Sequence, residues 1–181
     1  MMRIVLILSF VLFLSFLADQ TTSQEQNQPE PREEPPESCP ITKASTLPFL
    51  PPAPYPSDRE NVWIGSNKLW TFVPSDGVWR HLPHYTPDDS RFRQKVFWWS
   101  EGYDFRIENP PKFTITGKRL DGPAPPLASD PHANNGWTSD SHHPFIVDGI
   151  FIPALGCWQI TGHYKDEQLS YVVWVGRMPH V

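Results

Sequence analysis

The sequence predicts an all-β fold, a sandwich of about seven antiparallel strands. Short segments rich in aromatic and β-branched residues are separated by Gly, Pro or Asp breaks, as is typical of strands. No segment shows a helical period with capping residues. The C-terminal stretch Leu155–Val175 predicts a hairpin of two apolar strands, and a lone hairpin is marginal in water, so a second layer must cover it.

The alternation in the first hairpin strand indicates which face is buried. Trp158, Ile160 and Tyr164 lie on one face, and the other face is mostly polar. This pattern is typical of an antiparallel sheet with one wet side. Cys157 falls on the polar face and is expected to point away from the core.

The remaining candidate strands precede the hairpin and are short. With the hairpin strands Gly156–Tyr164 and Leu169–Val175, the predicted strands are Asn61–Gly65, Leu69–Val73, Arg93–Trp99, Phe113–Leu120 and Pro144–Val147. They belong to one predicted domain at 58–177, about 120 residues, which is enough for one core.

The N-terminal part is expected to be an export signal and a tether. An arginine followed by an apolar run from Ile4 to Leu17 predicts a signal peptide at 1–18, with an uncleaved membrane anchor as the alternative. Residues 19–38 are rich in Glu, Gln and Pro and predict a disordered acidic tether. Residues 39–57 combine prolines with apolar side chains and predict an extended strap packed on the domain.

Two cysteines in a chain with an export signal predict one disulfide, between Cys39 and Cys157. If Cys157 faces outward, a strap on the outside of the sandwich can reach it. The alternative is a free, buried thiol.

Two long connections, 74–90 and 121–143, carry the candidate ligand-binding residues, because long loops are often functional. Each contains a tryptophan, Trp79 or Trp137, whose flat face suits a sugar ring or a protein partner. The alternative is that each tryptophan folds back onto the core. The first connection also contains His81 and His84, which we include among the candidate ligand-binding residues.

Loop histidines are weak candidates for a metal site. The second connection contains His132, His142 and His143, and if the two loops meet at one end, three imidazoles could bind zinc or copper. Solvated histidines are the simpler interpretation. Three carboxylates after Trp99 (Glu101, Asp104 and Glu108) lie close in sequence, and we interpret them as surface or turn-capping acids.

Several segments carry a resemblance to known proteins. They include Lys68–Thr71, Arg93–Trp99, Thr116–Asp121 and, above all, the LGCWQITGHY segment Leu155–Tyr164. From about Cys39 to Val175 the chain resembles a group of uncharacterised, exported bacterial proteins with a C-terminal LGCWxITGxY segment. The closing segment also resembles the last two strands of bacterial immunoglobulin-like domains. The resemblance implies an immunoglobulin-like β-sandwich in the cell envelope or extracellular space, and it brings no activity or catalytic residues.

These observations predict an exported, non-catalytic binding or structural module. Its partner is expected to be a protein or glycan of the envelope or extracellular space, without a cofactor. Without the signal, 14 basic and 20 acidic residues remain, a net charge of −6 that disfavours nucleic acid as a partner. Membrane contact is expected only through an uncleaved N-terminal segment. A metal-binding envelope protein is the first alternative, and an enzyme with an unrecognised site is the second, although hydrolase and phosphate-loop motifs are absent from the sequence.

Overall fold

The computed structural model describes residues 34–43, 49–51, 61–84, 89–137 and 144–177, and the statements below concern these residues. The predicted signal peptide, most of the tether and part of the strap lie outside the described residues. So do His142 and His143.

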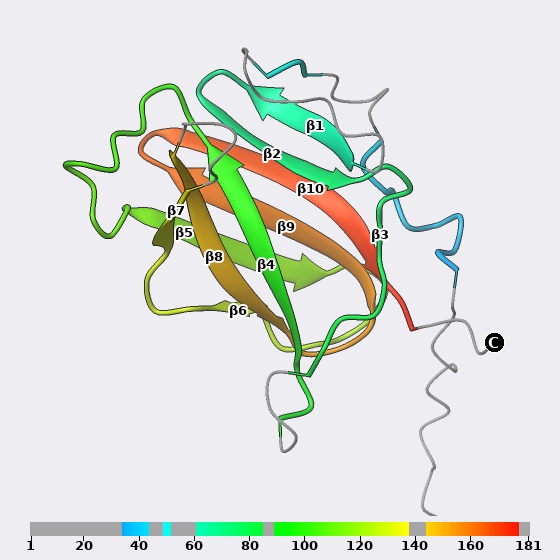
Figure 1. Ribbon diagram of the computed structural model, residues 1–181. Coiled ribbons are helices and arrows are strands. Elements are labelled where there is room, and N and C mark those ends of the chain that lie inside the picture. Colours follow the sequence, from blue (N-terminus) through cyan, green and yellow to red (C-terminus); the bar gives the residue numbers. More distant parts are fainter. Residues whose placement is uncertain (1–33, 44–48, 52–60, 85–88, 138–143, 178–181) are drawn as a thin grey trace, which may run out of the picture.

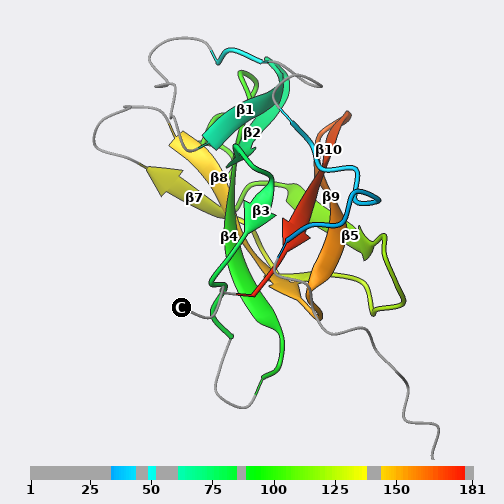
Figure 2. The ribbon, with the colours of Figure 1, turned by 90° about the vertical axis from the view of Figure 1, so that its right-hand side faces the viewer.

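Two β-sheets pack face to face, which confirms the predicted all-β sandwich (Figures 1 and 2). The described residues contain no helix. Sheet A consists, in spatial order, of β1 (Asn61–Ser66), β2 (Leu69–Pro74), β4 (Phe92–Trp99), β8 (Pro144–Ile152) and β6 (Ala128–Ser129), with β7 (Asn134–Trp137) also paired to β8. Sheet B consists of β3 (Val78–Trp79), β10 (Glu167–Val175), β9 (Gly156–Tyr164) and β5 (Phe113–Arg119).

Each of the seven predicted strands is present, but three more were missed. β3, β6 and β7 lie inside the two long connections and are two to four residues long, too short to leave an alternating pattern. The pairing of β3 with β10 is parallel, whereas the seven predicted strands pair antiparallel with one another. β8 is also longer than predicted and continues past Val147 to Ile152. The prediction stopped at Val147 because Asp148-Gly149 interrupts the apolar pattern, although these two residues do not end the strand.

The core between the sheets has the composition that the alternation predicted. Trp158 and Ile160 are fully buried, and Tyr164 is 1% exposed. They pack with Trp98 and Tyr171 in one apolar cluster that joins the two sheets. Burial of these large side chains is the main stabilising contribution to the fold, at about 1.5–3 kcal/mol for each.

The outer face of sheet A is also aromatic, and part of the strap covers it. Trp70, Trp99 and Phe145 form a second buried cluster on this side of the sheet. Phe49 packs against this cluster, with its ring centroid 5.6 Å from that of Trp70. Most of the tryptophans expected in the core therefore fill one of two apolar layers, on the inner or the outer face of the sheet.

The predicted disulfide between Cys39 and Cys157 is present, with 5.8 Å between the Cα atoms. Cys157 belongs to a small cluster separate from the main core, as its predicted outward direction requires. It is nevertheless only 1% exposed, because the strap lies over it. Thr42 extends this cover along β10: its N–H donates to the Val172 carbonyl oxygen at 3.0 Å, and the Val172 N–H donates to Thr42 Oγ1 at 2.8 Å.

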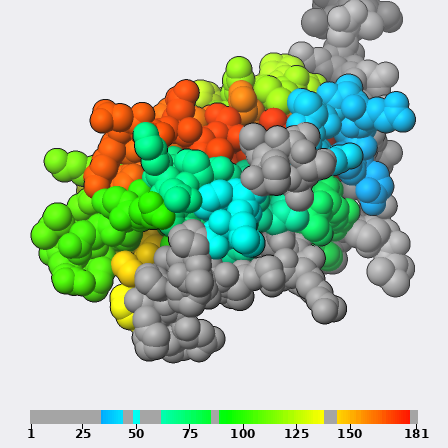
Figure 3. Space-filling model, turned by 90° about the horizontal axis from the view of Figure 1, so that it is seen from above, coloured from blue at the N-terminus to red at the C-terminus, as the bar shows by residue number. Residues whose placement is uncertain are grey.

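The strand register gives the sandwich two distinct ends. At one end β9 begins, next to Cys157 and the strap; we call this the disulfide end. At the other end, the β9–β10 turn lies beside the end of β4 and the β1–β2 turn; we call this the distal end. Seen from above, residues 34–43 and the segment 100–112 lie at opposite sides of the molecule (Figures 1 and 3).

Candidate functional site

The prediction that Trp79 exposes a flat face in a loop was wrong. Trp79 lies on β3, is 6% exposed and packs edge-on against Tyr171 in the main core. Its strand pairs with the last residues of β10, at the disulfide end. Because β3 pairs with β10, the indole ring of Trp79 points into the core, and Trp79 is a structural residue.

The two long connections do not bring their candidate residues together. His81 and His84 are exposed, and His84 stacks on Phe92 at the start of β4, toward the disulfide end. Trp137 pairs with Pro144 at the other end of β8. The β4–β8 ladder therefore separates Trp137 from His84 by roughly 20 Å.

The candidate metal ligands are not assembled in the part of the chain that the structure describes. His132 is exposed in the connection between β6 and β7. Within the described ranges, no group of three or more His, Cys, Asp or Glu side chains is placed to hold a metal ion. The positions of His142 and His143 lie outside those ranges.

Trp137 is the predicted candidate whose side chain does lie at the surface. It is 53% exposed at the end of β7, and its ring centroid lies 5.6 Å from that of Phe105. Ile107, two residues further along the same segment as Phe105, is 80% exposed. We call Phe105, Ile107 and Trp137 the distal apolar surface. Sequence reasoning missed Phe105 and Ile107, which follow the carboxylates Glu101 and Asp104.

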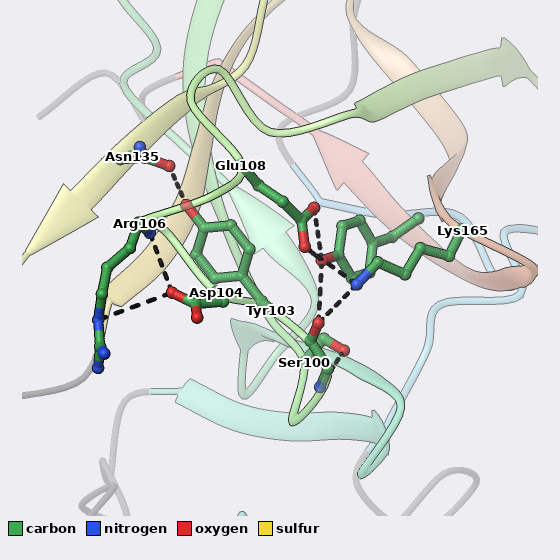
Figure 4. Close-up of polar contacts among 9 residues, drawn as sticks. Ser100, Tyr103, Asp104, Arg106, Glu108, Asn135 and Lys165 are labelled. Carbon is green, nitrogen blue, oxygen red and sulfur yellow. Dashed lines mark hydrogen bonds and ion pairs between the residues drawn. The ribbon is translucent and has the colours of Figure 1, made fainter.

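A tyrosine fixes one side of the segment that presents this surface. The Tyr103 hydroxyl donates a hydrogen bond to Asn135 Oδ1, so segment 100–112 is joined to β7 (Figure 4). Because Asn135 and Trp137 belong to the same strand, this bond sets the position of Phe105 relative to Trp137. Burial, and then the nearby Glu108 carboxylate, raise the pKa of Tyr103 to about 12, so this hydroxyl stays protonated as a donor.

A carboxylate fixes the other side of the same segment to the β9–β10 turn (Figure 4). Glu108 accepts hydrogen bonds from the Tyr164 hydroxyl, at 2.8 Å to each oxygen, and its Oε1 lies 3.0 Å from Lys165 Nζ. Lys165 Nζ also donates to the carbonyl oxygen of Gly102 at 2.6 Å. We call Glu108, Tyr164 and Lys165 the clamp. Of the three carboxylates that follow Trp99, Asp104 fits the turn-capping interpretation, since it accepts from the Arg106 N–H at 3.0 Å, whereas Glu108 is a structural acid that joins two elements.

The protonation states in the clamp suit a structural role better than a catalytic one. Burial raises the pKa of Tyr164 to about 12. Hydrogen bonds to Tyr164 and Glu108 raise the pKa of Lys165 above its usual value. A general base or a nucleophilic lysine requires a lowered pKa near neutral pH, and both shifts run the other way.

A shallow groove of about 420 Å³ lies next to the clamp at the distal end. The β1–β2 turn, the residues after β4 and the β9–β10 turn form its walls, with Lys68 and Glu167 paired across it at 3.0 Å. Glu101 and Asp166 also line it and are exposed. The distal end therefore combines a small apolar centre with charged groups of both signs.

Sequence reasoning also missed a buried acid in the middle of β8. Asp148 is 2% exposed, and burial, followed by the charge of Asp130, raises its pKa to about 7. Its Oδ1 has no hydrogen-bond partner among the described residues. The sequence signal for it is an acidic residue flanked on both sides by the apolar residues of one strand.

Comparisons with protein-family models, with curated proteins and with solved structures find no match to this chain. The described residues include no helix long and apolar enough to cross a membrane.

Proposed function

We propose that this chain is an exported, non-catalytic binding module that contacts a partner protein through the distal apolar surface. The observation that carries this proposal is the state of Trp137: more than half exposed, yet held on a strand against Phe105. Large apolar side chains that stay exposed on a fixed framework are typical of interaction sites. The disulfide supports an oxidising location, such as the periplasm or the extracellular space.

The shape and charge of the distal end favour a protein over a glycan. Phe105 and Trp137 are tilted by 59° to each other, so a flat sugar chain cannot stack on both rings. Ile107, the most exposed member of the surface, offers no ring face to a sugar. An apolar centre surrounded by both signs of charge is the usual composition of a protein interface, and the charges here include Asp104 and Arg106.

An anionic lipid surface fits this end less well, because Asp104 precedes Phe105 directly in the chain, and Glu101 and Asp166 line the groove of the distal end. These acids would be repelled by lipid phosphates. The fixed geometry of the site supports binding rather than chemistry, since the raised pKa values of Tyr164 and Lys165 keep both groups protonated at neutral pH.

Photo-crosslinking in the producing cells tests the proposal. A photoreactive residue at position 107 should give a defined protein adduct that Trp137→Ala abolishes, without a change in melting temperature, because the tryptophan is half exposed. The matched control places the same residue at position 120, since Leu120 is 40% exposed and lies at the disulfide end. Equal adducts from both positions, or an adduct at 107 that survives Trp137→Ala, would refute the proposal. Trp137-dependent retention on insoluble cell-wall glycan, without a protein adduct, would replace the protein partner by a glycan.

A further inference from the structure

Asp148 occupies a position that its strand otherwise uses for the core. It lies opposite Val96 in the β4–β8 ladder and shares its face with Ile146 and Ile150, both fully buried. A carboxyl group at such a position is costly when it is charged, because the ion loses its water and gains no counter-ion. The Asp148 Oδ1 atom has no hydrogen-bond partner among the described residues, so hydrogen bonding does not offset this cost at that atom.

The charged groups around Asp148 do not neutralise it. On the other face of β8, the Asp130 carboxylate occupies the space above Gly149, where an added Cβ would come within 2.3 Å of Asp130 Oδ2. Arg93 of β4 lies 3.9 Å from Asp130, so its charge is directed to that acid. The other titratable groups on the described elements packed around Asp148 are His132 and Lys95, both exposed, and the Tyr164 and Tyr171 hydroxyls of sheet B.

Of the elements that pair with β8, the segment 128–137 has the fewest paired positions. We call it the β6–β7 segment. β6 pairs with β8 at two positions and β7 at four, whereas β4 pairs with β8 at seven. Between β6 and β7, the Asp130 N–H donates to the Gly149 carbonyl oxygen at 2.8 Å, and Ala133 packs into the core. When an ion must reach water, the element with the lowest local stability opens first.

We propose that ionisation of Asp148 loosens the β6–β7 segment from β8, and that this couples pH to the position of Trp137, which the same segment carries. The link between Asp148 and the segment is the backbone: the Asp130 N–H donates to the carbonyl oxygen of Gly149, the residue next to Asp148, and Asp130 belongs to the connection that leads into β7. The effect of Asp148 on the β6–β7 segment does not depend on the proposed function, whereas its consequence for binding rests on that function.

The direction of the effect follows from linkage. The carboxyl group has a pKa of about 7 when the segment is closed and an ordinary value, near 3.8, when water reaches it. Opening therefore releases a proton between about pH 4 and pH 7, so the opening equilibrium rises by up to roughly tenfold per pH unit in that window and is constant on either side. The segment is held most firmly in acid.

Hydrogen exchange of the intact protein tests this, after correction for the intrinsic pH dependence of amide exchange. Between pH 5 and 8, protection at residues 130–137 should fall as pH rises and level off above pH 7 in the wild type, while Asp148→Asn should give a flat profile. Asp166→Asn, an exposed acid in the distal turn, is the matched control and should follow the wild type. A pH-independent wild-type profile, or the same slope in Asp148→Asn, would show that Asp148 does not control the segment.

A second variant keeps the test decisive if Asp148→Asn fails to fold. Asp130→Asn removes the negative charge next to Asp148, so the levelling of protection should move to lower pH. An unmoved profile in this variant would count against the proposal. The binding consequence is read separately, as the Trp137-dependent adduct from position 107 at pH 5.5 and pH 8. If hydrogen exchange of the segment does not depend on pH, the proposed effect of Asp148 on the segment is refuted. If no adduct forms at either pH, only the proposed function is refuted.

Discussion

Lys165 Nζ lies 3.0 Å from Glu108 Oε1, and this contact joins the β9–β10 turn to the segment that presents Ile107. Lys165 also has a φ of 52°, a left-handed conformation that turns usually assign to Gly, Asn or Asp. The turn keeps a lysine in this unfavourable backbone position, and the side chain folds back over the Tyr164 ring to reach Glu108. The contact is therefore a specific link between two distal elements.

Removal of this ammonium group should loosen segment 100–112. Lys165→Met keeps the length of the side chain but leaves Glu108, whose side chain is 15% exposed, with Tyr164 as its remaining side-chain partner. Because the lysine is half exposed, we expect a loss of only about 1 kcal/mol in the free energy of unfolding, together with faster hydrogen exchange at 101–109.

Lys68→Met is the matched control, because the Lys68–Glu167 pair has the same N–O distance, 3.0 Å, but lies in solvent. This substitution should change stability by less than about 0.5 kcal/mol and leave exchange at 101–109 unaltered. If the two substitutions lower the free energy of unfolding equally in urea denaturation, the Lys165–Glu108 contact stabilises the fold no more than a surface ion pair does.

The disulfide should be a major source of stability. It closes a loop with a sequence separation of 118, for which the chain-entropy model gives about 4–5 kcal/mol. We expect Cys39→Ser with Cys157→Ser to lose a stabilisation of this order in urea denaturation, and reductant to have the same effect on the wild type. Thiol titration of the unfolded, unreduced wild type should find no free thiol. A double variant as stable as the wild type would indicate that the Thr42–Val172 pairing holds the strap alone.

Gly77 should be intolerant of a side chain. Its φ of 68° is strained for other residues, and an added Cβ would lie 1.9 Å from Ile41 Cγ2 of the strap. Gly77→Ala is therefore expected to destabilise the fold by about 2 kcal/mol or more. Gly102→Ala is the control, since its Cβ would meet no atom closer than 3.6 Å and its backbone is not left-handed. If the two variants have the same melting temperature, the strap does not press on Gly77.

The sequence was informative where a pattern is local and repeated. The alternation in β9 predicted that Trp158 and Ile160 face inward and that Cys157 faces away, and both directions are confirmed. The same reasoning failed for Trp79, because its strand has two residues and its partner, Val175 of β10, lies 96 positions away in the chain. A contact of that kind leaves no periodic signal. Whether the sandwich is immunoglobulin-like in its detailed topology stays a prediction.

The candidate site was predictable only in part for the same reason. Trp137 was selected because a tryptophan in a long connection offers a flat apolar face to a ligand, and it is exposed. The bonds that position it join residues far apart in the chain, such as Tyr103 with Asn135, and depend on how sheet A places β7 beside the segment after β4. Asp148 was hidden by its neighbour, since Asp-Gly is typical of a turn. Only the pairing with β4 shows that the strand continues through it.

Asp148 should also leave a signature in the global stability of the protein. Its pKa is raised to about 7 in the folded state and is near 3.8 in the unfolded chain, so the folded state binds more protons between these values. The free energy of unfolding should thus fall as pH rises from about 4 to 7, by an amount on the order of 1–4 kcal/mol, and then stay constant. Asp148→Asn, which mimics the neutral acid, should match the wild type near pH 4 and exceed its stability above pH 7.

Asp76 and Asp89 act in the opposite direction, because their pKa values are lowered and their contribution is lost as pH falls below about 4. Both acids are present in wild type and variant, so they cancel in the difference between the two urea-denaturation curves. A difference that does not grow between pH 4 and pH 7 would mean that Asp148 is already ionised in the folded protein.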